Sequence, residues 1–257
     1  MAAVAPGPGV GAWTPGELAR QRAAGLFAAP VCVPLAILTM RFGFAWRIRD
    51  VASIRAQYAR LLAERRPLLV VANHLTMADS ALIGWGLASA TGHVLRYRGL
   101  PWNVPDQSRV DSSWLWRTLA YVMKCIPMPR GGGRDVVAGV LERLRHLLRS
   151  GQVVLMFPEG GRSRSGRVDP EMAAHGVGRL IKEVEGCRVL CVYLRGDAQQ
   201  TWTDLPARGD TFTIATRLVE PRTALRGLRA SRDLSAQVLD HLADLERAHR
   251  RERGVTG

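Results

Sequence analysis

Short apolar runs alternate with amphipathic stretches along the chain from residue 50 onward. Residues 68–72 read Leu-Leu-Val-Val-Ala and residues 153–157 read Val-Val-Leu-Met-Phe, a composition typical of strands that are buried on both faces. Three further runs of six or seven residues are less uniformly apolar. We therefore predict strands at residues 68–72, 93–98, 153–157, 188–194 and 211–217.

The stretches between these runs place apolar residues three and four positions apart, which is the period of an amphipathic helix. Helices alternating with short apolar strands favour a sheet that is covered on both faces. The fold class we predict is α/β: a single domain with a mixed, largely parallel sheet flanked by helices. The predicted helices are residues 50–66, 80–90, 112–124, 134–149, 177–184 and 231–252.

The N-terminal part has a different pattern. Residues 1–14 are rich in Ala, Gly and Pro, and we expect a flexible tail there. Residues 23–40 contain no charged side chain, and Pro30 and Pro34 are expected to kink a helix in this run. We predict that residues 15–49 form an apolar, helical membrane-association segment and residues 50–257 the main domain. Whether the segment spans the bilayer, lies in its interface, or packs on a soluble core as a helical hairpin stays open.

Composition limits the function. With 36 Lys and Arg against 22 Asp and Glu, the net charge is +14, which favours an anionic partner: nucleic acid, a phosphorylated substrate or an anionic membrane surface. A hydrophobic share of 47% and a charged share of 23% argue against a disordered chain and a multi-span membrane protein. The four cysteines lack metal-site spacing, so we expect reduced thiols and no metal.

The most polar loops follow predicted strands, where open α/β sheets place their sites. Asn73, His74 and Asp79 come directly after the strand at 68–72. On one continuous helix His74 and Asp79 would point about 140° apart. With His74 in the turn and Asp79 in the first helical turn, the carboxylate reaches a ring nitrogen and leaves the other nitrogen free to act as a base. A helix-capping Asp beside an ordinary His would give the same spacing.

Two glycine-rich basic segments support the interpretation of residues 73–79 as part of a functional site. The strand at 153–157 runs into Pro-Glu-Gly-Gly-Arg-Ser-Arg, in which Glu159, Gly160, Arg162 and Ser163 combine a carboxylate, bare backbone and guanidinium groups suited to phosphate. The other segment, residues 126–134, presents Arg130 between two prolines and three glycines. A solvated basic loop and a plain connector are the alternative interpretations.

In this order the three segments resemble the 1-acylglycerol-3-phosphate O-acyltransferase family, over roughly residues 65–220. The family's His-four-residues-Asp motif corresponds to residues 73–79, its Phe-Pro-Glu-Gly-x-Arg-Ser motif to residues 157–163, and its isolated phosphate-side arginine to Arg130. Three departures bear on the acceptor: Gly161 replaces a usual Thr, prolines flank Arg130, and residues 189–192 lack the usual proline. A Trp-rich stretch at 101–116 is also unusual.

The resemblance implies an acyltransferase that moves a fatty acyl group from acyl-CoA or acyl-carrier protein to a lysophospholipid-type acceptor, 1-acylglycerol-3-phosphate in the first place, in phospholipid biosynthesis. Another lyso- or hydroxylated lipid is the alternative acceptor. It also implies attachment to the cytoplasmic membrane with the catalytic domain on the cytoplasmic face, and no cofactor or metal. The implied catalytic residues are His74 and Asp79. The implied substrate-binding residues are Arg130, Glu159, Gly160, Arg162, Ser163 and Asn73, with Arg164 a secondary candidate.

Two other classes of function fit parts of the sequence. The first is a basic, non-catalytic protein that binds lipid or nucleic acid; the chain has no helix-turn-helix, zinc-finger or RNA-binding sheet motif, and we expect no nucleic-acid partner. The second is a hydrolase in which His74 activates Ser80 or Ser163. The chain lacks the Gly-x-Ser-x-Gly elbow of that class.

Overall fold

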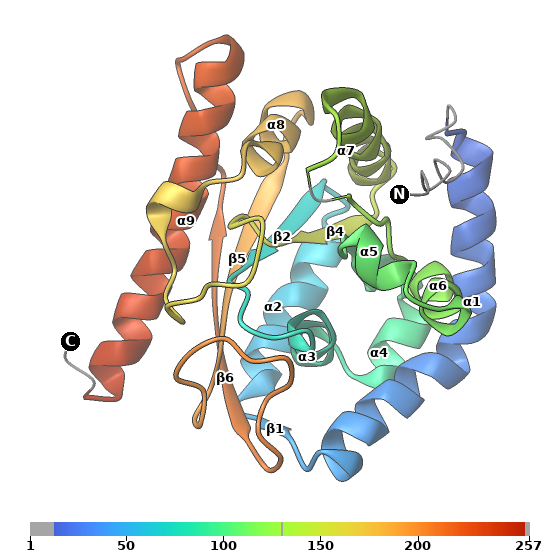
Figure 1. Ribbon diagram of the computed structural model, residues 1–257, viewed down its shortest axis with the longest axis vertical. Coiled ribbons are helices and arrows are strands. Elements are labelled where there is room, and N and C mark those ends of the chain that lie inside the picture. Colours follow the sequence, from blue (N-terminus) through green and yellow to red (C-terminus); the bar gives the residue numbers. More distant parts are fainter. Residues whose placement is uncertain (1–12, 130, 255–257) are drawn as a thin grey trace, which may run out of the picture.

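The computed structural model describes residues 13–129 and 131–254, and in it a six-stranded sheet forms the centre of the fold (Figure 1). The strand order is β1-β6-β5-β2-β4-β3, and every neighbouring pair is parallel except β5 with β6. The predicted α/β class with a mixed, largely parallel sheet is confirmed. The strands are β1 (Arg47–Ile48), β2 (Leu68–Ala72), β3 (Trp102–Asn103), β4 (Val153–Met156), β5 (Arg188–Gly196) and β6 (Thr211–Val219).

Helices cover both faces of this sheet. Successive strand residues point to opposite faces, so Leu69 and Val71 pack with α7, α8 and α9, while Leu68 and Val70 pack with α2 and α3. All of β2 is buried, which explains its unbroken apolar sequence. The helices are α1 (Pro15–Leu38), α2 (Val51–Ala63), α3 (Asp79–Leu87), α4 (Ala90–Leu95), α5 (Gln107–Val110), α6 (Trp114–Val122), α7 (Arg134–Arg149), α8 (His175–Glu183) and α9 (Gly227–Glu252).

One predicted strand is wrong. Residues 93–98 form the end of α4 and a 3₁₀ turn, η2 (Tyr97–Gly99). The Ser89 hydroxyl caps α4 by accepting a hydrogen bond from the Gly92 backbone, and the buried His93 ring bonds to the Gly84 carbonyl at 2.7 Å. These contacts favour a helix that the alternating sequence does not suggest. The two edges of the sheet are β3 and β1, neither of which was predicted.

The N-terminal helix α1 lies along one side of the domain, packed against α4 and α6 (Figure 1). It continues through Pro30 and Pro34 and ends in a π-helical turn, η1 (Thr39–Gly43). Residues 15–43 are long and apolar enough to cross a membrane, and 22% of their most apolar stretch is buried against the rest of the protein. The low burial separates α1 from an ordinary core helix and weakly indicates membrane association. One more short 3₁₀ turn, η3 (Pro170–Met172), precedes α8.

Candidate active site

Three loops meet at one edge of the sheet. Strands β5, β2 and β4 are parallel neighbours, so their carboxyl ends lie at the same edge. The loop of residues 73–78 follows β2, the loop of residues 157–169 follows β4, and the loop of residues 197–210 follows β5. The first two loops carry the predicted site residues, and the third contributes side chains that the sequence analysis did not identify.

His74 and Asp79 form a hydrogen-bonded pair. His74 lies in the turn after β2 and Asp79 is the first residue of α3, which brings His74 Nδ1 within 3.0 Å of Asp79 Oδ2. A carboxylate only accepts hydrogen bonds, so Nδ1 carries the hydrogen and Nε2 keeps its lone pair. The His74 side chain is 18% exposed and the Asp79 side chain 2%. The predicted geometry of a tethered imidazole with one free nitrogen is present.

Asp79 is held by its own loop as well as by His74. Its Oδ2 accepts hydrogen bonds from the Leu75 backbone at 2.6 Å and the Thr76 backbone at 2.8 Å. Its Oδ1 accepts from the Thr76 hydroxyl at 2.6 Å. Four donors therefore converge on a buried carboxylate and fix the position from which it orients the imidazole.

The loop after β4 supports His74 from the other side. The Phe157 ring stacks on the imidazole, with centroids 4.0 Å apart and planes at 16°. The Ser163 backbone donates to the His74 carbonyl at 2.9 Å. The predicted convergence of the two motif loops is therefore seen in the structure.

Glu159 is buried beside this contact, at 8% exposure. Burial raises the pKa of its carboxyl to about 8, although a hydrogen bond with the His74 backbone opposes the shift. Neighbouring carboxylates, Glu246 first, raise the pKa further. Its Oε1 is buried and has no hydrogen-bond partner among the described residues.

Arg162 is held by the loop after β5. Its Nη1 donates to the Thr203 carbonyl at 3.1 Å and to Asp204 Oδ1 at 2.7 Å. Its guanidinium carbon lies 4.7 Å from the centre of the Trp202 ring. The predicted phosphate-binding arginine is thus already paired with a carboxylate.

The other predicted site residues lie around this core. Both polar atoms of the Asn73 amide bond to the Leu194 backbone, at 2.8 and 3.0 Å, which ties the end of β2 to β5. The Ser163 hydroxyl bonds within its own loop to Arg167 and Ser165 rather than to His74. Gly160 has a φ of +66°, a conformation that favours glycine. Arg164 is exposed, and Arg130 lies outside the described residues.

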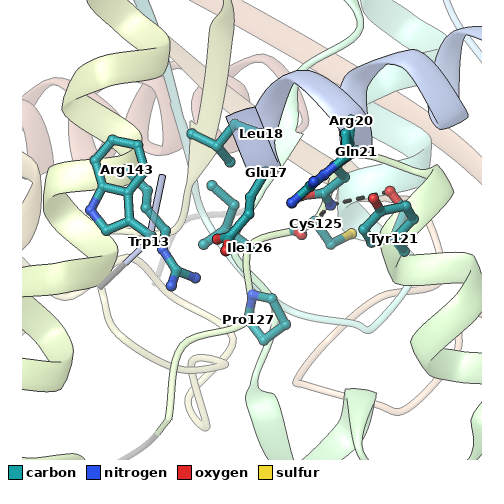
Figure 2. A pocket seen from close by; sticks show the side chains of 10 residues that line it. All are labelled: Trp13, Glu17, Leu18, Arg20, Gln21, Tyr121, Cys125, Ile126, Pro127 and Arg143. Atoms are coloured by element: carbon teal, nitrogen blue, oxygen red, sulfur yellow. Dashed lines mark hydrogen bonds between the residues drawn. The ribbon is translucent and has the colours of Figure 1, made fainter. Parts of the chain in front are cut away.

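A separate cavity of about 250 Å³ lies between the N-terminal end of α1, α6 and α7 (Figure 2). In Figure 2, Glu17, Arg20 and Arg143 point toward it, and Gln21 donates to the Tyr121 and Cys125 carbonyls at 3.1 and 2.9 Å. Pro127, which also lines it, stands three residues before Arg130. The cavity shares no lining residue with the three loops, so it is distinct from the His74 site.

Across the described ranges 13–129 and 131–254, no group of three or more His, Cys, Asp or Glu side chains is placed to hold a metal ion.

Sequence reasoning missed Phe157 as a partner of the imidazole, and it missed Trp202, Thr203 and Asp204 altogether. Open α/β sheets place their sites at the carboxyl ends of strands, which is why the loops after β2 and β4 were predicted to form the site. The polar loop after β5 also follows a strand, and this signal could have identified it. Nothing local in the Trp-Thr-Asp sequence predicts its contact with Arg162, which lies about 40 residues earlier in the chain.

Comparison with known protein families agrees with this geometry. A family model described as "Acyltransferase" matches residues 53–195, which is more than half of the chain and includes both motif loops. The chain belongs to this acyltransferase family, whose general activity is acyl transfer to a lipid acceptor. A search of curated proteins finds no match.

Proposed function

We propose that this protein transfers a fatty acyl group from acyl-CoA or acyl-carrier protein to the hydroxyl of a lysophospholipid-type acceptor, with 1-acylglycerol-3-phosphate as the first candidate. The observation that carries the proposal is the tethered imidazole: Nδ1 is hydrogen-bonded to Asp79 at 3.0 Å, so Nε2 is the free basic atom. This role would place the enzyme in phospholipid biosynthesis.

In the proposed reaction, His74 Nε2 removes the proton of the acceptor hydroxyl as its oxygen attacks the carbonyl carbon of the thioester. The tetrahedral intermediate collapses, the carbon–sulfur bond breaks, and the departing thiolate takes the proton back from the imidazolium. Asp79 stabilises that imidazolium, as the carboxylate of a catalytic triad does. Atoms and charge balance without a cofactor, a metal or a covalent enzyme intermediate.

The remaining predicted residues have supporting roles in this proposal. Arg162, together with Arg130 and the Gly160 backbone, binds the acceptor phosphate. Glu159, whose pKa is raised to about 8 by burial, donates a hydrogen bond from its protonated carboxyl to an acceptor oxygen. Asn73 fixes the His74 loop to β5, since both its amide atoms are used there, and Ser163 closes its own loop.

The test is acyl transfer from acyl-CoA to 1-acylglycerol-3-phosphate by the purified protein and by a His74→Ala variant. A positioned base contributes about 10²–10⁴-fold, so kcat should fall by that factor. The variant should stay folded, because the Asp79 carboxylate keeps its three other hydrogen bonds. Full turnover by the His74→Ala protein would refute the assignment of the base, and release of free fatty acid without any acceptor would favour hydrolysis instead.

We also propose that α1 and α6 rest together on the cytoplasmic face of an anionic membrane, with α1 lying in the interface rather than crossing it. The face of α1 toward the domain carries the small or polar residues Gln21, Gly25 and Ala29. Gly25 lies so close to Tyr97 and the Val122 carbonyl that a Cβ atom would not fit. These contacts, with the two hydrogen bonds of Gln21, hold α1 on the domain.

The exposed side chains of this pair are mostly apolar, and exposed arginines lie on the same elements and next to them. Every residue of α6 is at least partly exposed, which is unusual for so apolar a helix. Five arginines of α1, η1, α5 and α6 are exposed, and in the described part of the chain none forms an ion pair with an acidic side chain. They are Arg20, Arg22, Arg41, Arg109 and Arg117. The exposed apolar side chains are Leu26, Phe27, Val31, Leu35, Leu38 and Phe42 of the N-terminal helix and Trp114, Leu115, Trp116 and Tyr121 of α6.

Aromatic and aliphatic side chains with a rim of arginines suit the headgroup zone of an anionic bilayer. Flotation with vesicles of mixed anionic and zwitterionic lipid tests the proposal. Trp114→Ala combined with Trp116→Ala should weaken vesicle binding about tenfold or more, since each substitution removes apolar surface that the membrane would bury. The control is Leu225→Ala with Leu228→Ala, which removes two exposed side chains near the start of α9. Equal loss in both variants would contradict a specific face.

A further inference from the structure

The Arg162 guanidinium contacts three consecutive residues, 202–204. Trp202 lies under its face at 4.7 Å, and the Thr203 carbonyl and Asp204 carboxylate accept hydrogen bonds from Nη1 at 3.1 and 2.7 Å. The same guanidinium is proposed to bind the acceptor phosphate. The Asp204 carboxylate is therefore hydrogen-bonded to a nitrogen, Nη1, that the phosphate would use.

We propose that Asp204 takes the place of the acceptor phosphate on Arg162 in the unliganded protein, so that carboxylate and phosphate exchange when the acceptor binds. This inference rests on the proposed function of Arg162. It assigns Asp204 as a specificity residue that competes with anionic headgroups and has no effect on acceptors without a phosphate.

The burial of the two side chains favours exchange. The Asp204 side chain is 67% exposed and that of Arg162 is 22% exposed. Water screens the exposed carboxylate, so this ion pair contributes little free energy. A phosphate monoester offers more charge and three acceptor oxygens, and it can bind the planar fork at two nitrogens. The incoming phosphate therefore has the stronger interaction with the same guanidinium.

The backbone of the segment does not need to move. Thr203 donates to the Leu75 carbonyl and the Asp204 carbonyl accepts from Met77, both at 3.1 Å, which fixes the segment to the loop that carries His74. Trp202 and the Thr203 carbonyl hold Arg162 whether or not the Asp204 carboxylate is bound. Rotation of one exposed side chain is then enough to open the site, and the arginine stays aligned with the imidazole loop.

A purely structural role of Asp204 predicts the opposite change in the acceptor KM. If Asp204 only oriented Arg162, its removal would misplace the guanidinium and raise the acceptor KM. If Asp204 competes with the phosphate, its removal lowers that KM. The direction of one kinetic constant therefore separates the two roles.

The experiment compares Asp204→Asn with the wild type on 1-acylglycerol-3-phosphate and on monoacylglycerol, which has the hydroxyl but no phosphate. We expect the KM for the phosphate acceptor to fall about threefold, within the range of exposed ion pairs, and the KM for monoacylglycerol to stay within experimental error. Asp204→Glu, which keeps the charge, should keep the wild-type KM. A KM that rises or stays unchanged for the phosphate acceptor in Asp204→Asn overturns the proposal.

A matched control removes the same charge elsewhere. Asp244 on α9 pairs with Arg217 and Arg247, and its side chain is 42% exposed. Asp244→Asn adds the same unit to the net charge, so an equal fall in KM there would show a general attraction of anions and overturn the assignment.

A binding measurement separates this inference from the proposed reaction. Titration calorimetry with glycerol 3-phosphate needs no turnover, and Asp204→Asn should bind it about threefold more tightly than the wild type. If the wild type transfers no acyl group but the variant binds more tightly, the proposed function fails and the exchange stands. If acyl transfer occurs and the variant does not bind more tightly, the exchange is overturned and the proposed function stands.

Discussion

Asp79 and Asp204 lie at the same edge of the sheet, and each accepts a hydrogen bond from a basic side chain, His74 at 3.0 Å and Arg162 at 2.7 Å. Their surroundings differ. The Asp79 side chain is 2% exposed and receives four hydrogen bonds, whereas the Asp204 side chain is 67% exposed. A buried, fully bonded carboxylate fixes its partner in one orientation, and an exposed one can release its partner.

The difference corresponds to two tasks in the proposed reaction. The base must be aligned with the acceptor hydroxyl through many turnovers, which requires a rigid partner. The phosphate-binding arginine must be free when the acceptor arrives, which requires a partner that leaves. Burial, rather than the distance between the charged atoms, distinguishes the two pairs.

The largest expected effect is that of Asp79→Asn. The amide lacks the charge that strengthens the surrounding hydrogen bonds and stabilises the imidazolium, so kcat should fall about 10²–10⁴-fold and the free energy of unfolding by about 2 kcal/mol. Urea unfolding and steady-state kinetics measure the two quantities. A variant that keeps both wild-type values would show that the buried pair is not the orienting device.

Glu159→Gln should give the next largest effect, on the pH dependence of stability. The carboxyl has a pKa of about 8 in the folded protein because it is buried, and its usual value near 4.5 when unfolded. Between these two values the folded state holds a proton that the unfolded state lacks, so the free energy of unfolding falls as the pH rises from about 4.5 to about 8.

The Glu159→Gln variant does not ionise at this position and should lose this dependence. Near pH 4 it should match the wild type, and at pH 9 it should be more stable by a few kcal/mol. Urea unfolding at both pH values measures this, with Glu171→Gln, an exposed carboxylate of the same loop region, as the control. Parallel pH profiles for the wild type and the Glu159→Gln variant would contradict a carboxyl that is neutral at pH 7.

The smallest expected effect on the free energy of unfolding is that of replacing Asp204. Asp204→Asn removes one carboxylate charge, as Asp79→Asn does, but from an exposed ion pair, and it should change the free energy of unfolding by less than about 0.5 kcal/mol. Side-by-side urea curves of the two variants measure the difference. Equal destabilisation would show that Asp204 is as integral to its loop as Asp79 is.

Much of the fold follows from local sequence. The strand at Leu68–Ala72 and the helix at Arg134–Arg149 have the predicted boundaries, because an apolar run buried on both faces and an amphipathic period each depend mainly on neighbouring residues. Residues 93–98 were mistaken for a strand because a short alternating run does not reveal the Ser89 cap or the His93 contact with Gly84. Strands β1 and β3, two residues each, are too short to leave a period.

The sequence alone determined which candidate residues lie at the ends of β2 and β4, since His74 and Asp79 are near neighbours and the position of a loop after a parallel strand fixes its edge of the sheet. Only the tertiary structure decided what surrounds them. The stacking of Phe157 on His74 and the pairing of Asp204 with Arg162 join segments about 40 to 80 residues apart, and they depend on β4 and β5 being the two neighbours of β2. Strand order is a property of the packed sheet as a whole, and no local pattern encodes it.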